Sequence, residues 1–280
     1  MGGDPHFARK RVYISGGSSG IGLACARKFS RSGADVFIFA RTSATLEAAS
    51  DAVKESRASP TQRVAWACVD VTDHGVVAAV LKDAFSDFGA PDVVVTCAGI
   101  AYPDYFENIG QEHFDLTLRT NLLGTWNVLK AAIPAMQRPG GHIVTVSSVA
   151  GFLGVFGYTA YSASKFGVMG LSEALRAEMK PRGIRVSVLC PPDTDTPGLA
   201  FENRTKPVET RALGSRGGLM SAEDVADALL RGMKRGRFLI VPGLEGTFIH
   251  AAKRFVPGLV FSVMDAIVAR SRRSGGGGPA

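Results

Sequence analysis

The chain has 280 residues, of which 46% are hydrophobic and 20% are charged, and its net charge is +7. This composition suffices for one α/β domain or at most two small ones. Residues 1–11 are basic but lack the apolar segment of a secretory signal, and no run of about 18 apolar residues follows, so we expect no spanning helix. The four cysteines form no C-x-x-C pair and lie in apolar stretches, which predicts buried, reduced thiols and no metal site.

Short β-branched apolar runs alternate with amphipathic stretches from residue 11 to about residue 241. The runs are uninterrupted, as expected for strands that are buried on both faces of a parallel sheet. The helical stretches between them predict an α/β, Rossmann-type, doubly wound parallel sheet of seven strands with helices on both faces. The predicted strands are 12–14, 36–39, 64–69, 93–95, 143–146, 186–189 and 238–241. We divide the chain into an N-terminal extension (1–10), a catalytic domain (11–244) and a C-terminal tail (245–280).

The first predicted strand runs into a glycine-rich turn, SGGSSGIG over residues 15–22, and then a helix. The glycines at 16, 20 and 22 let the chain turn sharply and let backbone N–H groups approach a pyrophosphate at a helix N-terminus. At the end of the second strand, Arg41 stands where an NAD site has an acid, and a guanidinium pairs well with a 2′-phosphate. These features favour NADPH, although the glycine turn adds no second cation. Asp70, which ends the third strand, suits either the adenine amino group or a helix cap.

Tyr161 and Lys165 are four residues apart near the start of a long amphipathic stretch, so they share one helix face. A lysine ammonium stabilises a phenolate and lowers the pKa of the phenol, so the pair can serve as acid or base toward an alcohol or ketone oxygen. Ser148 ends a strand and is expected to bind the same oxygen. Ser147 competes for that role, because side chains alternate along a strand and only one of the two faces the site. By itself, the Tyr-x-x-x-Lys spacing also fits a structural pair.

Residues 11 to about 241 resemble the short-chain dehydrogenases/reductases. The matching pieces are GGSSGIG, CAG at 97–99, RTN at 119–121, VSS at 146–148 and the Tyr161–Lys165 pair. The resemblance implies that Tyr161 donates the proton in a reduction, while Lys165 lowers its pKa and binds the nicotinamide ribose. It implies further that Ser148 orients the carbonyl and that Asn121 holds a water linking Lys165 to solvent. Thr96 stands where the family has asparagine, and the family also implies a homo-oligomer, dimeric or tetrameric.

A narrower resemblance, to the 3-ketodihydrosphingosine reductases within this family, covers residues 156–160 (FGYTA), 191–198 (PPDTDTPG) and 202–210. It implies NADPH-dependent reduction of 3-ketosphinganine to sphinganine, a step of sphingolipid synthesis, in the cytoplasm. Attachment to the cytosolic face of a membrane, the endoplasmic reticulum in a eukaryote, stays open. The alternatives are another hydrophobic alcohol or ketone (a steroid, retinoid or acyl ketone) and, more remotely, a non-catalytic NADP-binding sensor.

These arguments give one set of predicted site residues. The catalytic residues are Asn121, Ser148, Tyr161 and Lys165. The cofactor-binding residues, besides Tyr161 and Lys165, are Gly16, Ser18, Ser19, Gly20, Ile21, Gly22, Arg41, Asp70, Val71, Ala98, Gly99, Ser147, Pro191, Thr194 and Thr196. The two threonines are expected to contact the nicotinamide amide and the phosphates.

Two further segments are expected to serve the substrate. Residues 193–218 are polar and rich in proline and glycine, which predicts a lid, and its acids Asp193, Asp195 and Glu202 are candidates to meet a substrate amine. The lipid chain is expected along apolar side chains, namely Phe152, Leu153, Val155 and Phe156.

The tail carries apolar residues on one helix face, interrupted upstream at Pro257 and Gly258, and a net charge of 5 − 1 = +4 from residue 247 onward. The apolar face consists of Leu259, Val260, Val263, Met264 and Ile267. This pattern fits either a membrane-surface helix with lipid headgroups as partner or a helix packed on the domain or on a second subunit. We predict no nucleic-acid partner, and a disordered end from residue 274.

Overall fold

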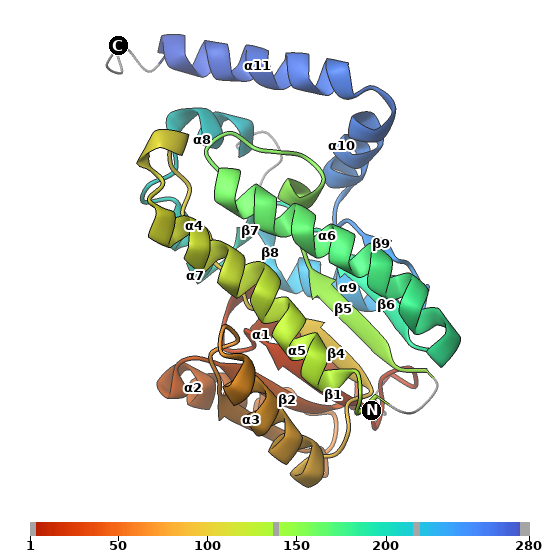
Figure 1. The fold of residues 1–280 in the computed structure, drawn as a ribbon. Coiled ribbons are helices and arrows are strands. Elements are labelled where there is room, and N and C mark those ends of the chain that lie inside the picture. The colour runs from red at the N-terminus through yellow and green to blue at the C-terminus, as the bar shows by residue number, and fades with distance from the viewer. Residues whose placement is uncertain (1–3, 137–139, 215–218, 275–280) are drawn as a thin grey trace.

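The computed structural model describes residues 4–136, 140–214 and 219–274 (Figure 1). Its main sheet has seven strands in the order β3-β2-β1-β4-β5-β6-β9, and every neighbouring pair is parallel. The strands are β1 (Arg11–Ser15), β2 (Asp35–Ala40), β3 (Val64–Cys68), β4 (Val93–Thr96), β5 (His142–Val146), β6 (Arg185–Leu189) and β9 (Leu239–Ile240). The predicted seven-stranded parallel sheet is confirmed. Its strand order reverses between β1 and β4, which is where such sheets bind their ligands.

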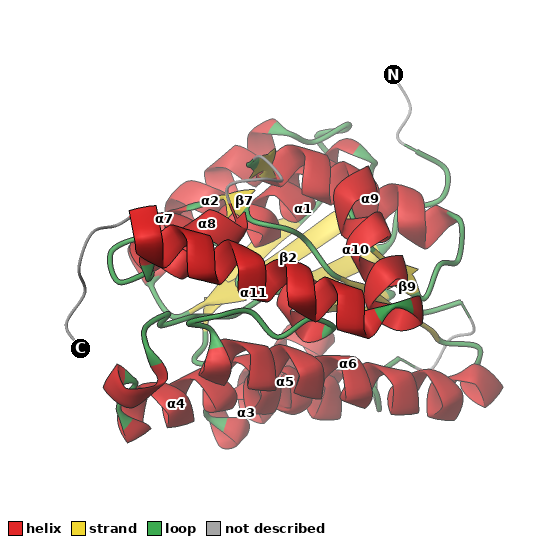
Figure 2. Ribbon diagram, turned by 90° about the horizontal axis from the view of Figure 1, so that it is seen from above, coloured by secondary structure: helices red, strands yellow, loops and turns green. Residues whose placement is uncertain are grey.

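Helices cover both faces of the sheet (Figure 2). One layer holds α1 (Gly20–Arg31), α2 (Ser43–Glu55) and α9 (Ala222–Lys234), and the other holds α3 (His74–Asp87), α4 (Gln111–Leu118), α5 (Gly124–Ala132) and α6 (Thr159–Met179). Successive residues of β1 serve the two layers, because side chains alternate along a strand. Val12 and Ile14 pack with α1 and α9, whereas Tyr13 packs with α3.

The described part of the N-terminal extension packs on the domain. Phe7 is fully buried and meets Phe29 edge to face, with ring centroids 5.2 Å apart. Asp4 forms an ion pair with Lys234 of α9. Residues 4–10 therefore close the edge of the core beside α1.

The segment predicted as a lid is more ordered than its composition indicates, within its described residues 193–214. It contains β7 (Thr194–Asp195), α7 (Pro197–Glu202) and α8 (Val208–Gly214), and β7 pairs in parallel with β8 (Met220–Ser221) in a small second sheet that we did not predict. The remaining lid residues, 215–218, lie outside the described residues. Four short helical turns lie between the longer elements. They are η1 (Phe106–Asn108), the π-helical η2 (Arg119–Leu123), η3 (Val149–Gly151) and η4 (Lys180–Arg182).

The tail forms two helices, α10 (Leu244–Phe255) and α11 (Pro257–Ser274), which meet at the predicted break. Helix α11 lies across α8 at one end of the molecule (Figure 1). In the described ranges, no helix is both long and apolar enough to cross a membrane. The predicted disordered end falls almost wholly outside the described residues, and residue 274 still belongs to α11.

The four cysteines are free thiols. Cys25 and Cys190 are buried as predicted, Cys97 is only partly buried, and the prediction is wrong for Cys68, which is exposed. Cys68 is the last residue of β3, an edge strand that no further strand covers. Its thiol donates to the carbonyl oxygen of Arg41 at 2.9 Å. An apolar run predicts a strand, but whether its last side chain is covered depends on the position of that strand in the sheet.

Candidate active site

A cavity of about 850 Å³ lies at the carboxyl ends of the strands, around the point where the strand order reverses. It is lined by every residue that we predicted to bind the cofactor, from the glycine turn to Thr196, and by the predicted catalytic residues Ser148, Tyr161 and Lys165. Asn121 alone among them does not line it. Of the four apolar residues expected along the lipid, only Leu153 and Val155 reach the cavity. Phe152 packs instead against His250, and Phe156 against Tyr105.

The glycine turn is shaped as a cradle that side chains would fill. Gly16 has a φ of +66°, and a Cβ there would lie 2.7 Å from the backbone nitrogen of Ala98. A Cβ on Gly22 would overlap the carbonyl oxygen of Gly16. Helix α1 begins at Gly20, and the side chain of Ser19 does not cap it, so its first N–H groups are available to an anion. The residues present therefore fit a dinucleotide.

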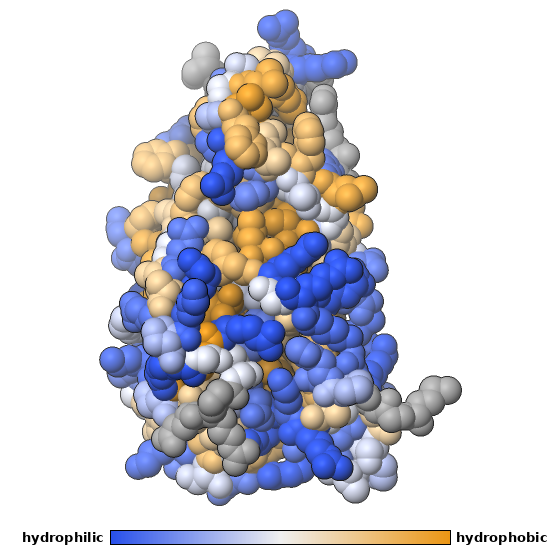
Figure 3. All heavy atoms as spheres, turned by 90° about the vertical axis from the view of Figure 1, so that its right-hand side faces the viewer, coloured by the Kyte–Doolittle hydropathy of each residue, from blue (hydrophilic) through white to orange (hydrophobic). Residues whose placement is uncertain are grey.

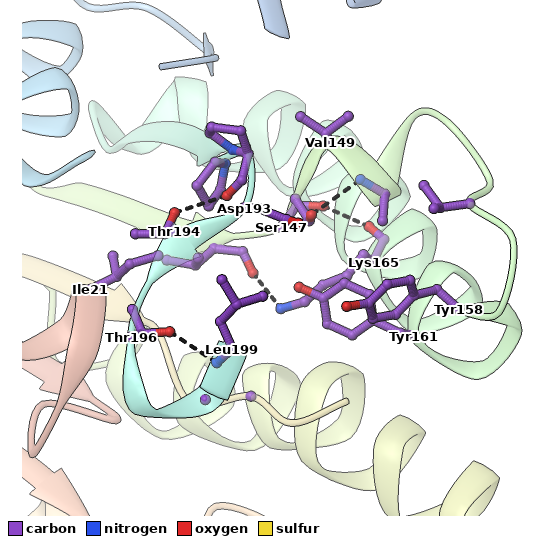
Figure 4. A pocket seen from close by; sticks show the side chains of 18 of the residues that line it. Ile21, Ser147, Val149, Tyr158, Tyr161, Lys165, Asp193, Thr194, Thr196 and Leu199 are labelled. Carbon is purple, nitrogen blue, oxygen red and sulfur yellow. Dashed lines mark hydrogen bonds between the residues drawn. The ribbon is translucent and has the colours of Figure 1, made fainter. Parts of the chain in front are cut away.

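Tyr161 and Lys165 lie on the first turns of α6, facing the end of β5 (Figure 4). Lys165 is 4% exposed, and its ammonium donates to the carbonyl oxygen of Val146 at 3.0 Å. Its Nζ lies 5.4 Å from the centre of the Tyr161 ring. Ser148 makes a hydrogen bond with Tyr161, and its Oγ accepts from the N–H of Ala150 at 3.1 Å. A phenol, an ammonium and a hydroxyl thus meet at the base of the cavity.

The two adjacent serines, Ser147 and Ser148, differ in their hydrogen-bond partners. The Ser147 hydroxyl is 1% exposed and donates to the carbonyl oxygen of Lys165 at 2.9 Å, so it fastens α6 to the end of β5. Ser148 points to the other side, toward Tyr161. The alternation of side chains along the chain explains why only one of the two adjacent serines faces the phenol.

Burial controls the acid–base character of this pair. It lowers the pKa of Lys165 to about 8. It also raises the pKa of Tyr161, and the negative charge of Glu202 raises it further, while the hydrogen bond with Ser148 opposes them. The net shift of the phenol pKa in this cavity is upward, because desolvation of the phenolate is the largest effect. The lowering by Lys165 stays a prediction. A phenol that keeps its proton is what a proton donor in a reduction requires.

Asn121 lies behind the catalytic side chains, in the π-helical turn η2 that joins α4 to α5. Its side chain accepts from the N–H of Ile100 at 2.8 Å and donates to the carbonyl oxygen of Ile100 and to Ser164 Oγ, both at 2.9 Å. A Cβ on Gly99 would lie 3.3 Å from Asn121 Oδ1 and 3.4 Å from Lys165 Nζ, so these groups are close neighbours. Asn121 therefore ties the loop after β4 to α6 beside the buried ammonium. π-Turns of this kind are frequent at functional sites.

Residues 10–207 match the family model described as short chain dehydrogenase. This chain belongs to the short-chain dehydrogenase family. It is an oxidoreductase, and both the family prediction and the enzyme prediction are confirmed. The solved structures agree: this short-chain dehydrogenase superposes on levodione reductase with a TM-score of 0.78 at 25% identity, covering 88% of this chain and 99% of that one. An alcohol dehydrogenase from Thermococcus sibiricus complexed with 5-hydroxy-NADP gives 0.72 at 26% identity, covering 83% and 95%.

The curated relatives agree with the narrower resemblance. This short-chain dehydrogenase is 40% identical over 242 residues to the 3-dehydrosphinganine reductase of Danio rerio, covering 86% of this chain and 73% of that protein. It matches the 3-ketodihydrosphingosine reductase of Mus musculus with the same identity and coverage. A 3-dehydrosphinganine reductase of Arabidopsis thaliana is 38% identical over 247 residues, covering 87% and 72%.

Sequence reasoning missed the roof of the cavity in this short-chain dehydrogenase. Helices α10 and α11 cover it, and their apolar side chains line it, including Phe248, Ile249, Val260, Val263, Met264 and Ile267. The signal was present, because the apolar face of the tail was recognised. What the sequence did not give was the surface on which that face packs.

It also missed Ser15, which takes part in the turn where Thr96 departs from the family pattern. Ser15 Oγ accepts from the N–H groups of Cys97 and Ala98 at 3.1 and 3.3 Å. The hydroxyl of Thr96 is buried and has no hydrogen-bond partner among the described residues. Ser15 therefore supports this turn. Its position directly before the glycine turn was the only signal.

Proposed function

We propose that this short-chain dehydrogenase uses NADPH to reduce a long-chain 2-amino ketone, 3-ketosphinganine, to sphinganine. The observation that supports this proposal most directly is that one cavity has Tyr161, Lys165 and Ser148 at its base and apolar side chains of α10 and α11 as its roof. A lipid ketone matches both parts, because its carbonyl needs a proton donor and its chain needs an apolar wall. The names of the curated relatives support the same substrate.

The side chains divide the chemistry among them. Bound NADPH supplies the hydride that the ketone carbon accepts. The Ser148 hydroxyl, whose oxygen already accepts from Ala150, donates to the ketone oxygen and stabilises the developing alkoxide. Tyr161 gives its phenolic proton to that oxygen, and the Lys165 ammonium stabilises the resulting phenolate. Holding ketone and cofactor together in one cavity supplies a large share of the rate.

Two side chains support the choice of NADPH and its placement. Arg41 is exposed at the end of β2 and lines the cavity, where its guanidinium suits a 2′-phosphate. Asp70 also lines the cavity, but its Oδ1 accepts from the N–H of Thr72 at 2.9 Å, so it caps its own turn as well as facing the adenine side. The cofactor proposal therefore depends chiefly on Arg41.

Attachment to a membrane surface also belongs to this proposal. The outer sides of α10 and α11 expose large apolar side chains that do not line the cavity, including Phe255 (77% exposed) and Phe261 (47%), beside Lys253 and Arg254. Figure 3 shows apolar side chains gathered at the end of the molecule where α10 and α11 lie. Apolar side chains with basic neighbours suit an anionic bilayer interface on the cytosolic side. The tail thus roofs the cavity with one side and offers the other to lipid.

Exposed apolar side chains on a different face support a homo-oligomer. Trp126 of α5 and Phe166 of α6 are 50% and 45% exposed. Helix α5 follows Asn121 in the chain, and helix α6 contains Tyr161. We propose that copies of the chain associate through these two helices. A dimer or tetramer formed there would leave α10 and α11 free to face a membrane.

The test is the loss of NADPH absorbance with 3-ketosphinganine. We expect turnover by the wild-type protein and, for Tyr161→Phe, a fall in kcat of at least roughly 100-fold with unchanged NADPH affinity, because the ring is kept and only the proton is removed. Near-wild-type turnover by that variant would overturn the assignment of the proton donor. Reduction of steroid or retinoid ketones but not of 3-ketosphinganine would replace the substrate while keeping the enzyme.

A further inference from the structure

We propose that Glu202, held by Tyr158, binds the ammonium group that the substrate carries next to its ketone. The proposal rests on the proposed function and goes further, since it assigns recognition of the amine to one carboxylate. Of the three acids that the sequence offered, Asp195 does not line the cavity, whereas Asp193 and Glu202 do. The structure therefore leaves two candidates, and their partners distinguish them.

Glu202 is the last residue of α7, and its carboxylate is brought to the proton donor by a second tyrosine. The Tyr158 hydroxyl donates to Glu202 Oε2 at 2.6 Å. The rings of Tyr158 and Tyr161 are 5.4 Å apart and lie side by side in the cavity (Figure 4). The carboxylate is close enough to Tyr161 for its charge to act on the phenol. An amine one carbon away from the ketone that Tyr161 protonates would thus meet Glu202.

Asp193 is engaged elsewhere. Its Oδ2 lies 3.5 Å from Nζ of Lys206, and that lysine is buried, with 6% of its surface exposed. The same Nζ lies 5.5 Å from the centre of the Tyr158 ring. Asp193 is therefore the carboxylate that forms an ion pair with Lys206. Within the described residues, the Tyr158 hydroxyl is the one hydrogen-bond donor to the carboxylate of Glu202.

The charge of Glu202 is incompletely compensated in the cavity. Burial raises its pKa, and the hydrogen bond from Tyr158 and the charge of Lys206 only oppose this. A buried carboxylate is stabilised when a cation arrives that can also donate hydrogen bonds. An alkylammonium supplies both. The arrangement thus favours an amino ketone over a neutral ketone of the same length.

The experiment compares 3-ketosphinganine with its N-acetyl derivative, which keeps the ketone and the long chain but carries a neutral amide in place of the ammonium. We expect Glu202→Gln to raise KM for the amine at least roughly tenfold, as the loss of a charge-assisted hydrogen bond requires, with less than about a twofold change for the neutral amide. Tyr158→Phe should raise KM for the amine in the same direction by a smaller factor, because it releases the carboxylate without removing it. Asp195→Asn, an exposed acid outside the cavity, is the matched control and should leave both substrates unchanged.

The outcomes separate the inference from the function on which it rests. Equal losses on both substrates would mean that Glu202 only fastens α7 to α6, and an unchanged KM for the amine would remove its role altogether. Either result overturns the ammonium site while the reductase proposal stands. A wild-type protein that reduces neutral lipid ketones but not 3-ketosphinganine would overturn both. Thermal melting of each variant, with Tyr158→Phe as the milder change, shows whether a loss comes from unfolding.

Discussion

Tyr161 and Lys165 illustrate, at the scale of single residues, how burial sets the protonation state of catalytic groups. The ammonium, with its pKa lowered to about 8, still carries its proton at neutral pH, and the phenol with its raised pKa carries its own. The pair is therefore poised to give a proton rather than to remove one. A protonated phenol is the form that a proton donor in the reduction of a ketone requires.

Arg41 is the residue on which the choice of cofactor depends. Replacing it with alanine removes the guanidinium that suits the 2′-phosphate and leaves the glycine turn unchanged. We expect Arg41→Ala to raise KM for NADPH roughly tenfold or more with little change for NADH, because one charge-assisted contact is lost. Steady-state kinetics with both cofactors checks this. Equal changes for the two cofactors would remove Arg41 from the 2′-phosphate site.

His142 makes the folded protein sensitive to acid. It is 2% exposed on β5, its Nε2 lies 2.8 Å from Ser187 Oγ, and burial lowers its pKa to about 3. Below pH 6.5 the unfolded chain binds a proton that the folded chain does not, so stability falls as the pH falls from 6.5 toward 3. We expect a loss of about 2 kcal/mol by about pH 5 from this residue. Denaturant unfolding of wild type and His142→Asn checks it, and identical pH slopes would contradict it.

At the scale of elements, the glycine turn connects β1 to α1 through a backbone with no room for side chains. In Gly22→Ala, the new Cβ meets the carbonyl oxygen of Gly16, so the turn must open. We expect NADPH affinity to fall at least roughly tenfold, measured by fluorescence titration. The matched control is Gly170→Ala in α6, where a Cβ meets nothing within 4 Å and helix propensity improves. An unchanged NADPH affinity in Gly22→Ala would mean that the glycine turn does not bind the cofactor.

An ion pair near the end of α11 helps to fasten this helix to α8, over the cavity. Arg272 Nε lies 2.8 Å from Oε1 of Glu209, which is 2% exposed on α8 and also accepts from Tyr105. We expect Arg272→Met to loosen the roof and raise KM for long-chain ketones roughly threefold, a modest effect because the arginine itself is exposed. NADPH affinity should not change, and the adjacent Arg273→Met is the control. A larger rise in KM in Arg273→Met than in Arg272→Met would mean that the ion pair of Arg272 does not hold the roof in place.

At the scale of the whole molecule, the apolar surface and the basic residues of the tail lie at one end, opposite α3 (Figure 1). We expect co-sedimentation with anionic phosphatidylserine vesicles that weakens with added salt and falls several-fold in Phe255→Glu, because Phe255 is exposed and lies outside the cavity. Val76→Glu, a matched change at an exposed position of α3, should have no effect. Binding that is unchanged both by salt and by Phe255→Glu would mean that the tail covers the cavity but does not bind lipid.

The sequence by itself determined the seven-stranded sheet, the glycine turn and the Tyr161–Lys165 pair. Each is encoded within a few residues: uninterrupted β-branched runs, a glycine spacing and an interval of four on one helix face. The strand ends then bring these local features together, because parallel strands direct their carboxyl ends to one edge of the sheet. This is why every predicted cofactor residue lines one cavity.

Only the tertiary structure decided the remainder, since contacts between distant segments and desolvation belong to the whole fold. It assigned Ser148 rather than Ser147 to the phenol, exposed Cys68 at a sheet edge and raised the phenol pKa against the effect expected of its lysine. It placed the tail over the cavity, and it brought Glu202 of α7 to Tyr158, which lies 44 residues earlier in the chain. The sequence pattern cannot predict this contact between Tyr158 and Glu202, because the contact depends on how α6 and the segment after β6 pack together.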